Sequence, residues 1–297
     1  MNNPLPRLPD FEYIRLDAPE STVAFLKEHQ GQAKPILGGT DLFVVLRDRR
    51  IQPKYLVELK HLEGFDVFNF NPDKGLTLGA AITLNQVISS NLVQEHYPIL
   101  GQAARQVGGY QLRNRATLVG NLCNASPCGD TIGPSLLYQG TLEVLGTGGP
   151  RSIPLTDFYL GPGKTSLQPG EIVRAIQFPM PSETSKGVYL AFGRNKLSDL
   201  ALAAVTILAA PHPAAASAFR FQIALSAVSP TVILVKEADA LLSDQQITPA
   251  SFEQAAKIAM DQCRPIDDIR SSKAYRRELV YNLTLTALHQ VWNTFHS

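Results

Sequence analysis

A pair of glycines between an apolar strand and an amphipathic helix is the feature that most limits how this chain can fold. The letters PILGGTDL run over residues 35–42, with a strand predicted at 34–37 and a helix at 41–49. Glycine lets the backbone approach a ligand closely, and the first amides of a helix are unpaired donors at the positive end of its dipole. The segment is therefore suited to a pyrophosphate. The alternative is a tight turn in which Thr40 or Asp41 caps the helix.

Composition indicates an ordinary soluble globule of about two domains. The 297 residues carry 27 Lys and Arg against 26 Asp and Glu, for a formal charge of +1, which argues against a nucleic-acid partner. Three cysteines, an odd number, favour a reducing compartment, so we expect a cytoplasmic protein. The longest apolar stretch, Leu200–Ala210, is shorter than the ~20 residues that cross a bilayer. We therefore expect neither a membrane span nor a signal peptide.

The order of the predicted elements indicates an α+β fold. Short strands are expected at 55–59, 76–80, 142–145 and 172–179, and helices at 21–29, 85–90 and 99–107. Ser21 or Thr22 is the expected N-cap of the first helix. The composition changes near 180–186, which suggests a domain boundary. Beyond it we expect strands at 188–194, 201–208 and 219–228, followed by helices at 231–242, 249–263 and 273–294.

A second candidate ligand segment runs from Gly108 to Asp130. Its short polar side chains, Thr117, Asn121, Asn124 and Ser126 among them, are suited to the phosphates and hydroxyls of a nucleotide. Asp130 can accept a hydrogen bond from a ribose. The alternative is a structured loop whose side chains satisfy their own backbone. A loop this long is either functional or conceals further elements.

The residues point to chemistry carried by a cofactor rather than by the protein. Cys123 and Cys128 lie close in sequence, but an iron–sulfur cluster needs four thiolates and the chain has three. No histidine lies near them at zinc-ligand spacing, so we expect no metal site. No nucleophile motif or paired-carboxylate signature is present, so we predict no catalytic residue. A bound nucleotide cofactor is the remaining source of chemistry.

Four motifs taken together resemble the FAD-binding medium subunit of the molybdenum hydroxylases, the family of xanthine dehydrogenase and aerobic carbon monoxide dehydrogenase. They are GGTDL at 38–42, LGAAIT at 78–83, QLRNRATLVGNLCNASPCGD at 111–130 and PIDDIRSSKAYRRELV at 265–280. The resemblance covers about residues 8–292. It implies a flavoprotein fold of the vanillyl-alcohol oxidase type, like that of p-cresol methylhydroxylase, with a C-terminal α+β domain of a three-stranded sheet and helices. The implied limits are 1–60 and 61–178 for the two FAD-binding subdomains and 179–297 for the third domain.

The resemblance also implies which residues bind FAD. Residues 35–42 would hold the pyrophosphate through backbone amides, and residues 117–121 would form a second clamp for a phosphate and the ribityl chain. Asp130 would meet the ribose, and Ile172 or Val173 would lie by the adenine. The implied cofactor-binding residues are Pro35, Ile36, Leu37, Gly38, Gly39, Thr40, Asp41, Leu42, Thr117, Leu118, Val119, Gly120, Asn121, Asp130 and Ile172.

Two positions in this implied site are less well defined. Members of the family usually have two glycines where this chain has Val119 and Gly120, so the valine side chain is expected to crowd the phosphate or restrict the turn. The aromatic residue expected at the flavin ring corresponds to Tyr189 or Phe192. We also expect that Gly39→Val would fill the pyrophosphate space and yield a folded protein without cofactor.

The function implied by the resemblance is electron transfer by an oxidoreductase subunit. An iron–sulfur small subunit would supply electrons taken from a substrate by a large subunit that holds the molybdenum cofactor. FAD would pass them to NAD+, oxygen or another acceptor. A free-standing flavin oxidoreductase and a non-catalytic nucleotide-binding assembly subunit are the alternatives.

Overall fold

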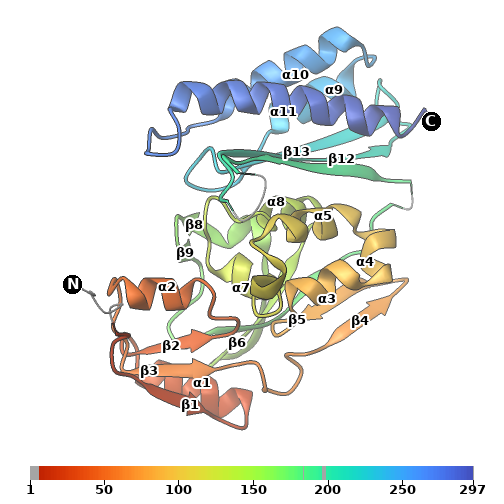
Figure 1. Cartoon of the computed structure of the whole chain (residues 1–297). Coiled ribbons are helices and arrows are strands. Elements are labelled where there is room, and N and C mark those ends of the chain that lie inside the picture. Colours follow the sequence, from red (N-terminus) through yellow and green to blue (C-terminus); the bar gives the residue numbers. More distant parts are fainter. Residues whose placement is uncertain (1–6, 183, 196–198, 297) are drawn as a thin grey trace.

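Three β-sheets follow one another from the N-terminal to the C-terminal part of the molecule (Figure 1). A computed structural model describes residues 7–182, 184–195 and 199–296. Within these ranges the sheets have three, five and four strands, and a two-stranded ribbon lies beside them. The α+β class predicted from the sequence is thus observed.

The N-terminal sheet is parallel because helices connect its strands. Strand β3 lies between the other two, and the elements are β1 (Glu12–Arg15), α1 (Pro19–Glu28), β2 (Ala33–Ile36), α2 (Leu42–Arg47) and β3 (Tyr55–Glu58). Helix α1 begins after Ala18, whose carbonyl accepts from the hydroxyls of Ser21 and Thr22. The prediction that Ser21 or Thr22 is the N-cap was wrong, because Pro19 begins the helix and places both residues inside its first turn.

The central sheet is antiparallel, in the order β4-β5-β10-β6-β7. Its strands are β4 (Phe68–Asn71), β5 (Gly75–Gly79), β6 (Thr141–Gly146), β7 (Gly149–Pro154) and β10 (Ile172–Phe178). The segment between β7 and β10 holds the 3-10 helix η1 (Leu155–Asp157) and the ribbon of β8 (Tyr159–Gly161) and β9 (Lys164–Thr165). Strand β10, the last in sequence, occupies the middle of the sheet.

Six short helices lie between β5 and β6. They are α3 (Leu84–Ser89), α4 (Asn91–His96), α5 (Pro98–Gln106), α6 (Tyr110–Arg113), α7 (Leu118–Cys123) and α8 (Ile132–Leu137). The stretch 108–133, expected to be mostly loop, therefore contains α6, α7 and the start of α8. Thr117 caps α7, since its Oγ1 accepts from the Gly120 N–H at 2.9 Å. Capping and burial outweigh the low helix propensity of this glycine- and asparagine-containing segment.

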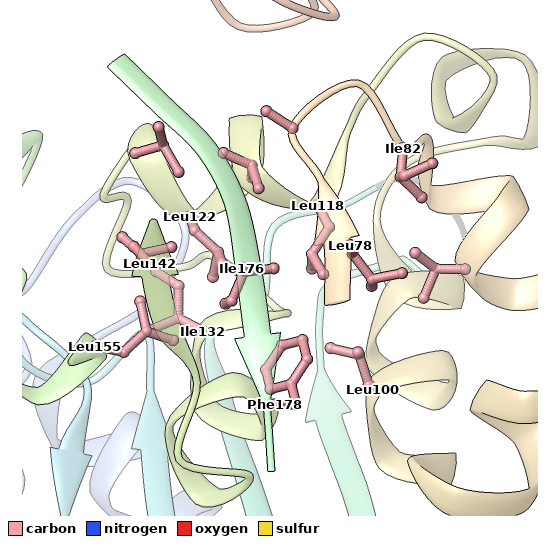
Figure 2. Close-up of a cluster of buried hydrophobic side chains, with 14 of the residues drawn as sticks. Leu78, Ile82, Leu100, Leu118, Leu122, Ile132, Leu142, Leu155, Ile176 and Phe178 are labelled. Carbon is pink, nitrogen blue, oxygen red and sulfur yellow. The ribbon is translucent and has the colours of Figure 1, made fainter. Parts of the chain in front are cut away.

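The hydrophobic core lies between the central sheet and these helices. Figure 2 shows Leu78, Leu142 and Ile176 from the sheet meeting Leu118 and Leu122 of α7. These five side chains are fully buried. The packing fixes α7 against the sheet and so sets the position of the segment that precedes it.

The C-terminal part is a four-stranded antiparallel sheet with helices. Its elements are β11 (Lys186–Phe192), β12 (Ala203–Pro211), β13 (Phe219–Ser226), β14 (Ile233–Leu234), α9 (Lys236–Asp244), α10 (Pro249–Gln262) and α11 (Lys273–Asn293). Helices α10 and α11 lie over one face of this sheet, while α5 and α8 lie on its other side (Figure 1). The three predicted strands are present, and β14 adds a short fourth. Pairing of β14 with β13 also explains why α9 begins later than the predicted residue 231.

The longest helix, α11, packs one face on this sheet through residues such as Val280, Ala287 and Leu288. It also carries several charged residues. Within the described ranges, no helix combines the length and the apolar character that crossing a membrane would need.

Candidate cofactor-binding site

A cleft of about 580 Å³ lies where the two glycine-bearing segments meet. Residues 34–42 line one part of it and residues from the stretch 116–130 line another, with Leu167, Ile172 and Val173 adding an apolar wall. Every residue of the implied FAD-binding set except Leu118 lines this cleft. Leu118 instead points into the core (Figure 2). The volume is in the range of sites for organic cofactors.

Gly38 allows the two segments to touch backbone to backbone. A Cβ atom at this position would overlap the carbonyl oxygen of Arg115 and would lie 2.8 Å from the Arg115 carbonyl carbon and 2.9 Å from the Ala116 Cα. Real Cβ contacts are not this short, so glycine is required for the close approach. The backbone just before Thr117 therefore packs directly on the glycine turn.

The turn at 38–41 presents a run of unpaired backbone donors. Among the described residues, no hydrogen bond uses the backbone N–H of Gly38, Gly39, Thr40 or Asp41. Unpaired amides are uncommon in folded proteins unless a ligand or water satisfies them. All four residues line the cleft. Successive N–H groups in such a turn form a concave anion site that suits a diphosphate.

Gly39 is required for the conformation of this turn, whereas the expectation was that it leaves space for the pyrophosphate. It has a φ of +73°, which glycine adopts without strain. A Cβ here would meet Phe43 Cε2 at 2.9 Å and Ile36 Cδ1 at 3.1 Å, which are side chains of the same segment. Gly39→Val would therefore distort the turn itself, and the expectation that its side chain would fill the pyrophosphate space is corrected.

In the second segment, Thr117, Gly120 and Asn121 line the cleft. The Thr117 hydroxyl oxygen is occupied by the cap of α7. Asn121 Oδ1 accepts from the Thr131 hydroxyl at 2.7 Å, which fixes the amide orientation and leaves its NH₂ group as the donor. The segment thus offers the Asn121 amide as a donor, since the backbone N–H groups of Leu118, Gly120 and Asn121 already donate within the protein.

Val119 does not restrict the turn as expected. It lies inside α7, outside the set of residues with positive φ, and its side chain is fully buried in the hydrophobic core. A second glycine is not needed for the backbone conformation at this position. The valine contributes packing beneath the cleft.

Asp130 lines the cleft close to the C-terminal sheet. Its Oδ1 accepts a hydrogen bond from the Tyr189 hydroxyl at 2.6 Å. Burial raises the pKa of the Asp130 carboxyl to about 6, and the hydrogen bond from Tyr189 opposes this rise. The carboxylate is therefore poised to lose or gain a proton a little below neutral pH.

The two aromatic candidates for the flavin ring differ in exposure. Tyr189 is 6% exposed and is held by Asp130, whereas Phe192 is 41% exposed and packs edge-on against Tyr275 at a ring distance of 6.4 Å. Neither residue is among those that line the cleft. Phe192 is the more exposed of the two rings.

Cys123 and Cys128 both line the cleft, and all three thiols, Cys263 included, are free. Burial raises the pKa of Cys123 to about 12 and also raises that of Cys128. These thiols are therefore protonated and act as small apolar groups. In the described part of the chain, no three His, Cys, Asp or Glu side chains gather at metal-binding distance.

Sequence reasoning missed part of the wall. Lys34, Gly163, Leu167 and Glu171 also line the cleft. Glu171 receives a bidentate pair from Arg151 at 2.7 and 2.8 Å and accepts from the Gln168 N–H, which fixes the turn before Ile172. The position of Glu171 just before the implied adenine residue was the available signal. Lys34 lies on β2, and Gly163 and Leu167 come from turns and loops with no motif of their own.

The fold and this cleft define a nucleotide-binding chain, and comparison with known proteins specifies the class. A family model described as the FAD binding domain in molybdopterin dehydrogenase matches residues 9–181. A second, the CO dehydrogenase flavoprotein C-terminal domain, matches residues 189–291. The first match covers more than half of the chain. The chain therefore belongs to the family of molybdopterin-dehydrogenase FAD-binding subunits, and FAD is its cofactor.

Similar proteins support the same family. A xanthine dehydrogenase FAD-binding subunit of Escherichia coli is 29% identical over 256 residues, covering 85% of this chain and 86% of the relative. The carbon monoxide dehydrogenase medium chain of Hydrogenophaga pseudoflava is 27% identical over 286 residues, covering 96% of this chain and 98% of the relative. A solved structure of carbon monoxide dehydrogenase from that organism matches with a TM-score of 0.91 at 27% identity, covering 97% of this chain and 99% of its counterpart. The predicted family, fold and oxidoreductase class are confirmed.

Proposed function

We propose that this chain is the electron-transfer subunit of a heteromeric molybdenum hydroxylase, and that its FAD lies in the cleft between the two glycine-bearing segments. The observation that carries the proposal is the run of four unpaired amides from Gly38 to Asp41, which line that cleft. A diphosphate supplies the acceptors that these donors lack. The close approach at Gly38 keeps the second segment beside them.

The other cleft residues have complementary roles in this proposal. Asp130 accepts from a hydroxyl of the nucleotide, and the Asn121 amide donates to the phosphate or ribityl part. Ile172 and Val173 provide apolar contact for the adenine. Both side chains are buried apolar groups of the cleft wall, and such groups suit the flat apolar faces of an aromatic ring. We assign the exposed Phe192 ring, rather than the buried Tyr189, to the flavin, although Phe192 does not itself line the cleft. FAD, when bound, accepts electrons singly or in pairs, so it can connect one-electron and two-electron partners.

The relatives support the assembly into a larger complex. They are named as medium chains or subunits of carbon monoxide dehydrogenase, glyceraldehyde dehydrogenase and nicotine 6-hydroxylase. By analogy, an iron–sulfur small subunit supplies the electrons, and a large subunit holding the molybdenum cofactor oxidises the substrate. NAD+, oxygen or another carrier then accepts the electron pair. This chain itself would not contact the organic substrate.

The proposal is tested by identifying the cofactor released when the purified protein is denatured. We expect FAD at about one molecule per chain, reduced by the complete complex and its substrate, but not by the substrate with this chain alone. Reduction of the isolated chain by an organic substrate would instead favour a free-standing flavin enzyme. A chain that neither retains nor takes up FAD would favour the non-catalytic assembly subunit.

A further inference from the structure

Tyr189 connects the C-terminal sheet to the cofactor cleft. Its hydroxyl donates to Asp130 Oδ1 at 2.6 Å, and its backbone N–H donates to Gln102 Oε1 at 3.0 Å. The residue lies on β11 and is 6% exposed. Its ring is therefore fixed between β11, helix α5 and the loop that carries Asp130. Tyr189 does not itself line the cleft.

We propose that Tyr189 is a positioning residue that keeps Asp130 ionised and oriented toward a hydroxyl group of the bound nucleotide, so that the chain retains its cofactor in a pH-dependent way. This inference rests on the proposed function, which places Asp130 at the cofactor. It adds a residue of the C-terminal domain that acts on the site without touching the ligand.

The geometry leaves one carboxylate oxygen for the ligand. Among the described residues, Tyr189 is the only side chain that donates a hydrogen bond to Asp130, and it uses Oδ1. The Oδ2 atom remains free to accept. A carboxylate with one oxygen bound by a rigid phenol has a defined orientation, which lowers the entropy lost when a ligand hydroxyl binds the other oxygen.

The ionisable groups around this carboxylate come from β11, from its own loop, from the loop before α11 and from α11 itself. Tyr189 faces it from β11, and the Cys128 thiol faces it from its own loop. Arg270 and Arg276, from the loop before α11 and from α11, act on the Cys128 thiol. Helix α5 contributes only the neutral Gln102 to Tyr189. Tyr189 is thus the polar side chain that most directly determines the charge of Asp130.

The sign of the pH effect follows from these contacts. Burial raises the pKa of Asp130 to about 6, while the Tyr189 hydrogen bond lowers it. A hydroxyl donor binds the ionised carboxylate more tightly than the protonated acid. FAD affinity is therefore highest above about pH 6, where Asp130 is ionised, and it falls as the pH decreases through that value. Without the phenol hydroxyl the pKa of Asp130 rises further, so the loss of affinity begins at a higher pH.

The experiment measures the dissociation constant of FAD for the full-length apo-protein between about pH 5 and about pH 8, by quenching of FAD fluorescence. The wild-type affinity should fall by up to tenfold per pH unit below about pH 6. Tyr189→Phe should bind FAD somewhat more weakly than the wild type even near pH 8, because Asp130 loses its fixed orientation, and its further loss of affinity should begin about one pH unit higher than in the wild type. Asp130→Asn should bind weakly with no such pH dependence.

Tyr97→Phe is the matched control, because Tyr97 is also buried and hydrogen-bonded but lies outside the cleft. It should keep the wild-type pH profile. A uniform loss of affinity at every pH in Tyr189→Phe would show a merely structural role and overturn the inference, as would an unshifted profile. If Asp130→Asn instead binds FAD with the wild-type affinity and profile, then Asp130 is not at the cofactor and the proposed site fails.

Discussion

At the residue scale, the adjacent glycines Gly38 and Gly39 have different structural roles. Gly38 faces the backbone of Arg115 and Ala116, whereas Gly39 faces Phe43 and Ile36 of its own segment and adopts a left-handed conformation. The glycine turn between a strand and a helix could be predicted from the sequence, because these elements follow each other locally, and its role in holding a pyrophosphate stays a prediction. Which glycine meets the distant segment could not, because that depends on tertiary packing.

Gly38→Ala should weaken FAD binding at least tenfold, because the new Cβ forces the two segments apart. Fluorescence titration with FAD measures the effect.

Gly79→Ala is a control of similar steric severity outside the cleft, since its Cβ would overlap the Phe65 carbonyl oxygen. It should lower the free energy of unfolding without a comparable loss of affinity in the folded fraction. Gly148→Ala, where the Cβ has open space, should change neither quantity. Wild-type affinity in Gly38→Ala would show that the close approach is unnecessary for binding.

At the element scale, helix α7 illustrates why short helices are difficult to predict. Its six residues, LVGNLC, include a glycine and an asparagine, and an isolated helix of this length is unstable in water. It forms because Thr117 caps it and because Leu118, Val119 and Leu122 are buried against the central sheet. The resemblance implied that this segment binds the cofactor, and most of it lines the cleft, but the resemblance could not show that the Leu118 and Val119 side chains are buried in the core.

Val119→Gly tests this assignment of α7. Removing a fully buried valine side chain and adding glycine to a helix should lower the free energy of unfolding by about 3 kcal/mol. Urea denaturation measures this loss. The affinity of the folded protein for FAD should stay within about threefold of the wild type, because the valine packs beneath the cleft. A marked gain in FAD affinity would mean that the valine does crowd the phosphate.

At the scale of the whole molecule, the cleft unites residues from distant parts of the chain. Strand β10 inserts into the middle of the central sheet and brings Ile172 to the same cleft as Gly38 and Asp130. Periodicity predicted β5, β6 and β10 individually, but it predicted neither β4 and β7 nor the order in which the strands pair. The domain limits 1–60, 61–178 and 179–297 stay a prediction. The hydrophobic cluster under the central sheet also includes Val23 and Leu26 of α1, so packing is continuous across residue 60.

The most direct test of the account is a crystal structure of the chain with FAD bound. The account predicts diphosphate oxygens within hydrogen-bonding distance of the backbone N–H groups of residues 38–41, with the segment 117–121 on the other side of the cofactor. A diphosphate bound elsewhere, with those four amides still lacking acceptors, would contradict it.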